Sequence, residues 1–285
     1  MPARYSFLFV ITDAHQPSGT TAHDAPGAAS SGVYHVPVLA GEVVRQLAGA
    51  GHVLDGTLGG GGHTEALLAA GARVTAVDRD PDAIAAAGVR LARDVRAGAL
   101  RLVPGNYAAL GHSSVAAERF DGLLLDLGVS SHQIDAAARG FSFREGAPLD
   151  MRMGPDAVQD AATFLNTSAE GELAWVFREY ADERRAIRLA REVVRRRATR
   201  PFATSDDFVG AIRATLGPRS GPGEFARLFQ AVRIAINDEL RGLERALPDL
   251  RDRLLPNGVF VVIAYHSGED RIVKHAFRDW STACT

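Results

Sequence analysis

Short apolar runs alternate with helix-forming segments over much of the chain. Continuous apolar strands are typical of a parallel sheet that is covered on both faces. A glycine-rich turn at residues 59–62 precedes a helical segment at residues 64–70, and Pro81 suits the first turn of another helix. The pattern predicts an α/β fold with a doubly wound parallel sheet. Its expected strands are residues 53–54, 73–77, 100–103, 122–127 and 259–263.

The pattern changes after the fourth strand. Apolar positions recur at helical spacing over residues 159–216, and Thr204 and Asp207 have the spacing of a capping box. A break rich in glycine and proline at residues 217–223 separates this region from one further apolar stripe. That stripe comprises Phe225, Leu228, Phe229, Val232, Ile236, Leu240, Leu243 and Leu247. We therefore expect an all-helical domain inserted between the fourth and fifth strands.

The first part of the chain is poor in residues that build a core. Fifteen of the twenty residues at positions 13–32 are Ala, Ser, Gly, Pro or Thr, which predicts disorder. The apolar run at residues 5–11 is too short to span a membrane. We expect a disordered leader at residues 1–32, an α/β core at residues 33–136 and 223–285, and an inserted helical domain at residues 137–222.

Charge and cysteine content restrict the function only modestly. The net charge is −2, and the single cysteine, Cys284, permits neither an internal disulfide nor a cysteine metal cluster. Residues 178–200 hold nine arginines against four acidic residues, as expected for a phosphate-binding surface. Lys274 is the only lysine, however, so the chain is generally biased towards arginine. A solvated helix face explains the same run equally simply.

Candidate chemistry lies at the ends of the predicted strands, where open α/β sheets bind ligands. The stretch from Asp55 has the form D-x-x-x-G-x-G, and Asp78 follows Gly59 by nineteen residues. Glycines permit close approach of a nucleotide, and Asp78 can accept hydrogen bonds from ribose hydroxyls. Thr64 stands where the dehydrogenase pattern G-x-G-x-x-G requires its last glycine. This departure favours S-adenosylmethionine over a dinucleotide, although a tight structural turn also accounts for the glycines.

Asp126, at the end of the fourth strand, is the candidate for methyl-transfer chemistry. The lone pair of a cytosine amine is delocalised into the ring, and acceptors that bind its hydrogens free that lone pair for attack. Asp126 is one such acceptor, and the adjoining loop offers Ser130 and Ser131. An equally simple interpretation is that Asp126 caps the next helix or turn. We expect His63 to start a helix near the cofactor and His266 to orient a loop; no spacing predicts a metal site.

Nine separate motifs, in order along the chain, resemble the bacterial 16S ribosomal RNA cytosine-N(4) methyltransferases, the RsmH or MraW family. The match runs from about Tyr34 to Phe277. Its motifs are HVPVL (35–39), DGTLGGGGHT (55–64), VDRDP (77–81), LLDLGVSS (124–131), RGFSF (139–143), PLDMRM (148–153), YADER (180–184), FQAVRIAIN (229–237) and HSGEDR (266–271).

The resemblance implies a class I, Rossmann-like methyltransferase core that uses S-adenosylmethionine, with the inserted helical domain recognising RNA. The substrate it implies is a decoding-centre cytosine of 16S rRNA, within the small ribosomal subunit, reached by extruding the base. We expect a cytoplasmic monomer or homodimer without membrane association. The family's cofactor positions carry over to Gly61, Gly62, His63, Asp78, Tyr107, Asp126 and Gln133.

Four departures from the family pattern accompany the match. Gly268 stands where the family usually has leucine, Tyr107 replaces a common phenylalanine, and residues 217–223 lack a frequent histidine-proline pair. Family members also continue into a basic tail and the final strands of the sheet, so the sheet edge is expected to be incomplete here. Two alternatives remain open: a methyltransferase acting on another RNA or protein amine, and an inactive cofactor-binding homologue.

Overall fold

In the computed structural model, which describes residues 5–11 and 37–282, the chain divides into two compact units. The α/β unit contains the chain up to Gly128 and from Leu243 onward, and the helical unit is Val129–Gly242. Helical insertion between two strands of the sheet is therefore confirmed, as is the α/β fold class. Within the described residues, no helix is both long and apolar enough to cross a membrane.

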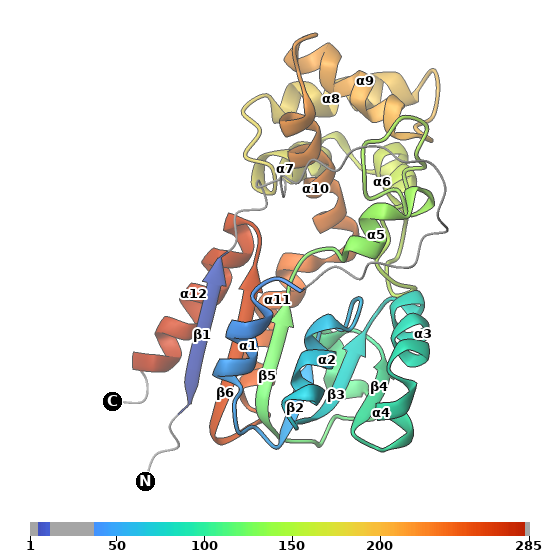
Figure 1. The fold of residues 1–285 in the computed structure, drawn as a ribbon. Helices are drawn as coiled ribbons and strands as arrows, with labels where there is room; N and C mark the ends of the chain where they lie inside the picture. The colour runs from blue at the N-terminus through green and yellow to red at the C-terminus, as the bar shows by residue number, and fades with distance from the viewer. Residues whose placement is uncertain (1–4, 12–36, 283–285) are drawn as a thin grey trace, which may run out of the picture. The chain divides into compact units, whose positions relative to one another are not determined.

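The described strands of the α/β unit form one parallel sheet in the order β1-β6-β5-β2-β3-β4 (Figure 1). The chain winds outward from β2 to β4 and then returns to β5 on the other side of β2. The winding direction therefore reverses between β2 and β5. Folds of this kind bind ligands at the carboxyl ends of the strands where the direction reverses. The strands are β1 (Ser6–Ile11), β2 (His52–Asp55), β3 (Arg73–Asp78), β4 (Leu100–Pro104), β5 (Phe120–Asp126) and β6 (Leu254–Ala264).

Strand β1 contradicts the expected disordered leader over residues 6–11. It pairs in parallel with β6 along its whole length, from Ser6 opposite Val259 onward. Its Phe7 ring lies 5.0 Å from the Phe277 ring and 5.3 Å from the Trp280 ring. These alternating apolar side chains find a partner strand more than 240 residues along the chain, which a local reading cannot detect. The rest of the expected leader, residues 12–32, lies outside the described residues.

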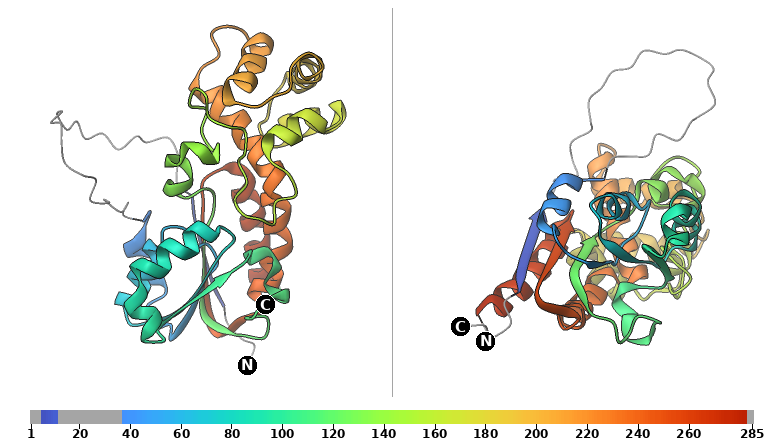
Figure 2. Two further views of the ribbon diagram at one scale, coloured as in Figure 1. Left: turned by 90° about the vertical axis from the view of Figure 1, so that its right-hand side faces the viewer. Right: turned by 60° about the horizontal axis from the view of Figure 1, so that its bottom comes forward.

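Helices cover both faces of the sheet (Figure 2). Alternation along β5 shows how: Leu123 and Leu125 point into the layer of α11 and α12, while Leu124 points into the layer of α1 and α2. The first layer comprises α11 (Glu239–Arg251) and α12 (Ser267–Thr282), together with η1 (Tyr107–His112). The second comprises α1 (Ala40–Gln46), α2 (Gly62–Ala69), α3 (Pro81–Arg90) and α4 (Ala92–Arg96). Burial on both faces explains the continuous apolar strands.

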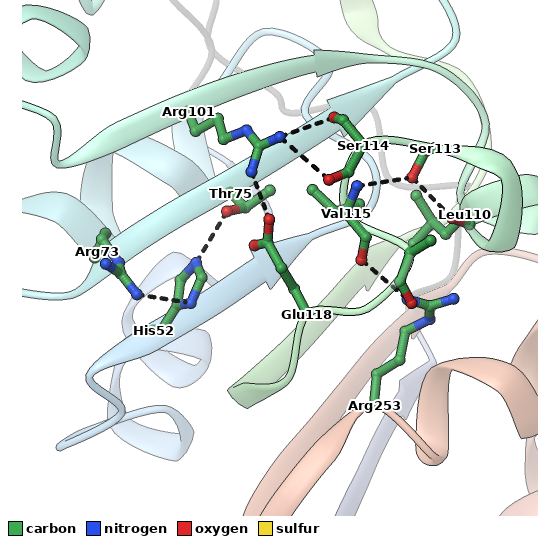
Figure 3. A network of polar contacts seen from close by, with 11 residues as sticks. His52, Arg73, Thr75, Arg101, Leu110, Ser113, Ser114, Val115, Glu118 and Arg253 are labelled. Carbon is green, nitrogen blue, oxygen red and sulfur yellow. Dashed lines mark hydrogen bonds and ion pairs between the residues drawn. The ribbon is translucent and has the colours of Figure 1, made fainter.

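A polar network ties together the ends of the sheet opposite the predicted site (Figure 3). His52 at the start of β2 lies 2.9 Å from Thr75 Oγ1, and Arg73 reaches its other ring nitrogen at 3.1 Å. Arg101 of β4 pairs with Glu118, just before β5. The His52 contacts link the neighbouring strands β2 and β3, and the Arg101–Glu118 pair fastens the segment before β5 to β4, so the network stabilises the sheet.

The helical unit has its own buried core. Phe177 and Phe208 stack with ring centroids 5.9 Å apart, and Phe208 also contacts Phe229. The predicted capping box is confirmed, because Asp207 accepts a hydrogen bond from the backbone of Thr204 at 3.0 Å. The elements of this unit are α5 (Ser131–Asp135), η2 (Ala137–Arg139), α6 (Ala161–Thr167), α7 (Glu170–Glu179), α8 (Ala186–Arg197), α9 (Ser205–Leu216) and α10 (Pro222–Asn237).

The apolar stripe that the sequence presents as one helix is divided between the two units. Asp238 has a φ of 52° and ends α10 in a left-handed conformation. Phe225 and Val232 before this break pack in the core of the helical unit, whereas Leu243 and Leu247 after it pack against the sheet. The helical unit therefore runs from Val129 to Gly242, whereas the sequence predicted an insert at residues 137–222.

Asn237, the last residue of α10, joins two of the sequence motifs. Its buried side chain accepts a hydrogen bond from Met153 N and donates to Met151 O, each at 2.8 Å. Met151 has a φ of 59°, a left-handed conformation that bulky residues rarely adopt. The amide thus fixes an irregular segment of the helical unit against a helix.

Candidate cofactor and catalytic site

The turn after β2 needs glycine for reasons of backbone geometry. Gly59 and Gly61 have φ values of 48° and 76°, and Gly61 is the N-cap of α2. A Cβ atom at Gly62 would lie 3.0 Å from Pro37 Cγ. Arg90 of α3 donates to Gly60 O at 2.7 Å and holds the turn from outside. Backbone conformation at Gly59 and Gly61 and close packing against Pro37 at Gly62 therefore favour glycine at these three positions without any ligand.

Asp55, at the end of β2, holds the glycine-rich turn in place through hydrogen bonds. It is buried, and its carboxylate accepts hydrogen bonds from the Thr64 hydroxyl at 2.7 Å and from Thr57 N at 3.1 Å. Burial raises the pKa of this carboxyl. Because its polar partners belong to the turn and to α2, Asp55 supports the turn.

Asp78, at the end of β3, contacts the same turn. Its Oδ2 accepts a hydrogen bond from Gly59 N at 2.7 Å, and its Oδ1 accepts one from Asp80 N at 2.8 Å. Burial raises its pKa to about 6. Each carboxylate oxygen has two acceptor positions, so this pair of bonds leaves further acceptor capacity on Asp78. The residue both shapes the glycine turn and can accept hydrogen bonds from hydroxyl groups.

Asp126 ends β5 beside the end of β2. Its backbone N donates to Thr57 Oγ1 at 2.6 Å, which ties the two strand ends together. Its Oδ1 accepts a hydrogen bond from the Tyr265 hydroxyl at 2.7 Å, and its Oδ2 lies 3.4 Å from His63 Nε2. The side chain is 24% exposed. Two side chains thus hold the carboxylate while part of it stays accessible, an arrangement unlike that of a helix cap.

His63 lies in the first turn of α2, as the sequence predicts, and is buried. Burial lowers the pKa of its ring, but the hydrogen-bonding and charge effects of Asp126, together with Asp55, outweigh burial and raise the pKa overall. The imidazole therefore complements the negative charge of Asp126.

Tyr265 and Glu269 are the site residues that the sequence analysis missed. Tyr265 follows β6 directly, and its backbone N donates to Glu269 Oε2 at 2.9 Å. Glu269 is buried, and its other oxygen lies 3.2 Å from His266 Nε2. Burial and the nearby Asp126 raise the pKa of the Tyr265 phenol, which keeps it a hydrogen-bond donor. Its position directly after a strand was the available signal, which it shares with the adjacent His266.

His266 has the loop-orienting contact expected from the sequence, since its Nδ1 accepts a hydrogen bond from Gly268 N at 3.2 Å.

Tyr107 lies beside the turn after β2: a Cβ atom at Gly56 would lie 3.3 Å from Tyr107 Cβ. Glycine at position 56 therefore permits the approach of this aromatic residue. Within the described residues, no group of three or more histidine, cysteine or acidic side chains could hold a metal ion.

Ser130 and Gln133 belong to the helical unit, where they form a reciprocal pair at the start of α5. Ser130 N donates to Gln133 Oε1 at 3.1 Å, and Gln133 N donates to Ser130 Oγ at 3.3 Å. This is the geometry of a capping box, which the S-x-x-Q spacing could have predicted. The Ser130 hydroxyl can still donate its own proton. The side chain of Ser131 lies outside the described residues.

Fold and geometry together define a class. The sheet is parallel and doubly wound, and it carries a helical insertion. A glycine turn follows its central strand β2, and acidic residues end the two neighbouring strands. These features are those of a Rossmann-like methyltransferase core. The chain belongs to the MraW methylase family, whose model matches residues 32–285.

Three relatives share the description "Ribosomal RNA small subunit methyltransferase H". The protein of Gemmatimonas aurantiaca is 66% identical over 255 residues, covering 89% of this chain and 81% of the relative. Those of Heliobacterium mobile and Mycolicibacterium paratuberculosis are 45% and 48% identical, covering 88% and 85% of this chain and 84% and 68% of the relatives. An rRNA methylase structure from Streptococcus thermophilus overlaps 34% of this chain and 58% of its own at a TM-score of 0.27 and 22% identity, too little to describe the site.

Proposed function

We propose that this protein transfers a methyl group from S-adenosylmethionine to the exocyclic N(4) amine of a decoding-centre cytosine in 16S rRNA. Membership of the MraW methylase family and relatives described as small-subunit rRNA methyltransferases support the reaction and the substrate class. The resemblance of nine motifs to the cytosine-N(4) enzymes supports the choice of atom. The observation that carries the proposal is the accessible, doubly held carboxylate of Asp126 beside the glycine turn.

The residues present fit the cofactor. Asp78 retains acceptor positions beyond its two backbone bonds, as ribose hydroxyls require, and the turn it contacts is free of side chains at Gly59 and Gly61. Tyr107 adds an aromatic surface next to Gly56. We assign cofactor binding to Gly61, Gly62, His63, Asp78, Tyr107, Asp126 and Gln133.

S-adenosylmethionine would supply an electrophilic methyl group at this site. The chain must then make the cytosine amine a nucleophile. Asp126 would accept hydrogen bonds from the amine hydrogens, which reduces delocalisation of the nitrogen lone pair into the ring. Tyr265 and His63 hold the carboxylate in place, so that it need not reorganise during the reaction. Ser130 and Ser131 remain the alternative acceptors.

We assign RNA recognition to the helical unit. The function also implies a cytoplasmic protein that acts on the small subunit, as a monomer or homodimer. Runs of arginine alone do not locate the RNA surface, because Arg195 and Arg196 both bind Glu192 and Arg197 donates to Leu165 O and Ser168 O. The hydrogen bonds of these three arginines are therefore made within the unit.

Mass-spectrometric nucleoside analysis of 16S RNA tests the proposal. RNA from cells that lack the protein should lose one N(4)-methylated cytidine, and the purified protein with S-adenosylmethionine should restore it. Unchanged RNA with methylation of another RNA or a protein would establish the first alternative. Cofactor binding without transfer to any of these would establish an inactive homologue.

A further inference from the structure

The helical unit contains a polar cavity of about 440 Å³. It lies between the segment that joins α7 to α8 and the junction of α9 with α10. Four arginines contribute to its lining: Arg184, Arg185, Arg219 and Arg227. None of them belongs to the candidate cofactor and catalytic site.

Two of these arginines build the frame of the cavity. Arg185 donates to Leu216 O at 3.0 Å and to Thr215 O at 3.4 Å, which satisfies carbonyls at the C-terminal end of α9. Arg227 forms an ion pair with the buried carboxylate of Glu183 at 2.6 Å and also donates to Ala181 O. Their hydrogen-bonding capacity is therefore largely used within the protein.

The other two arginines have no such role. Arg184, next to the framing Arg185, and Arg219, in the turn between α9 and α10, have neither a hydrogen bond nor an ion pair within the described residues. Both are exposed and line the same cavity. Their guanidinium groups are therefore available to a ligand in the cavity.

The acidic residues of the lining do not neutralise these two groups. Glu183 is committed to Arg227 and to the backbone N of Arg185, at 2.8 Å. Glu224 accepts a hydrogen bond from Gly221 N at 3.0 Å, and this bond lowers its pKa. Only Asp182 has no partner within the described residues. Two free cations thus face one free carboxylate.

We propose that this cavity binds a backbone phosphate of the RNA substrate between Arg184 and Arg219. The inference rests on the proposed function. Guanidinium groups bind phosphate oxygens in a bidentate geometry, and two of them contributed by separate segments can hold one phosphate from two sides. The first turn of α10 also borders the cavity through Glu224, and the positive end of a sixteen-residue helix favours an anion there. A phosphate contact of this kind positions RNA without reading its sequence.

The test compares two double variants that remove equal charge from the same unit. Arg184→Gln with Arg219→Gln empties the cavity of its free cations, whereas Arg195→Gln with Arg196→Gln removes arginines that bind Glu192. Filter binding measures the affinity of each protein for in vitro transcribed 16S rRNA over a range of KCl concentrations. Calorimetry measures the affinity for S-adenosylmethionine, and thermal unfolding measures stability.

The cavity variant should bind 16S rRNA about tenfold more weakly, and the slope of log affinity against log salt should become shallower by about one. Its KM for RNA should rise while kcat, cofactor affinity and thermal stability stay unchanged. Equal affinity and slope in the cavity variant and the wild type would overturn the proposal, as would equal losses in both double variants. If the wild type neither binds nor methylates 16S rRNA, the proposed function itself fails and the cavity proposal falls with it.

Discussion

Tyr265 donates its hydroxyl proton to Asp126 Oδ1 at 2.7 Å, joining the residue after β6 to the end of β5. Their backbones belong to adjacent strands, so this bond spans the sheet edge at which the candidate site lies. It orients one carboxylate oxygen and leaves the other 3.4 Å from His63. The phenol therefore sets the direction in which Asp126 can accept further hydrogen bonds.

Replacing Tyr265 by phenylalanine should lower the single-turnover methylation rate about tenfold with little change in cofactor affinity. A hydrogen bond to a charged group is worth about 1.5–3 kcal/mol, and the partial exposure of Asp126 favours the low end of that range. Tyr5→Phe is the matched control, because the Tyr5 phenol has no hydrogen bond within the described residues. Equal rates in the two variants would remove Tyr265 from the positioning of Asp126.

Asp126→Ala separates catalysis from cofactor binding. If the carboxylate serves the transition state, single-turnover methylation should fall about a hundredfold or more, while the affinity for S-adenosylmethionine changes much less. Asp126→Asn should lose less activity, because it keeps one acceptor oxygen. A loss of affinity as large as the loss of rate would show that Asp126 is a cofactor ligand alone. Near-normal turnover would direct attention to Ser130 and Ser131.

Cofactor affinity should depend on pH through Asp78, whose pKa burial raises to about 6. Hydrogen bonds from ribose hydroxyls favour the charged carboxylate, so binding lowers that pKa, and affinity should fall as the pH drops below about 6. Calorimetric titration between pH 5 and 8 measures this for the wild type and for Asp78→Asn, which cannot titrate. Asp78→Ala should weaken binding about tenfold or more at neutral pH. Parallel pH profiles for the wild type and the Asn variant would contradict the role of Asp78.

The same raised pKa has a defined effect on stability. Because the pKa of Asp78 in the folded protein lies above the ordinary value of 3.8, the native state takes up this proton before the unfolded state does. The contribution of Asp78 to the free energy of unfolding therefore rises as the pH falls from about 6 towards 4. Asp78→Asn should remove that part of the pH dependence.

Asn237→Ala should destabilise the helical unit. It removes hydrogen bonds to Met151 O and Met153 N in a buried setting, and each unsatisfied buried group costs about 1–3 kcal/mol. Denaturant unfolding followed through Trp175, in a Trp280→Phe background, reports on this unit, since these are the two tryptophans of the chain. Gln230→Ala in the same helix is the control, because Gln230 has no hydrogen bond within the described residues. Equal unfolding midpoints for the two variants would contradict the structural role of Asn237.

Local patterns were enough to predict the strands from β2 to β6 and the polar residues at their ends, but not β1. Asp78 and Asp126 lie at strand ends as expected, because buried parallel strands are continuous apolar runs that stop at polar residues. The hydrogen bond from Tyr265 could not be predicted, since it depends on the register of β5 against β6. The division of the last apolar stripe also escaped detection, because Asp238 supports either a continuing helix or a left-handed break.

Strand β1 has a consequence for the order in which the protein assembles. It is synthesised before the other described strands, yet its partner β6 is complete only when residue 264 has been added. At the usual rates of translation the two are separated by a few tens of seconds, during which β1 has no edge to pair with. Closing so long a loop also adds an entropic cost to the pairing. We therefore expect the inner strands to assemble before β1 docks against β6, although β1 is made before them.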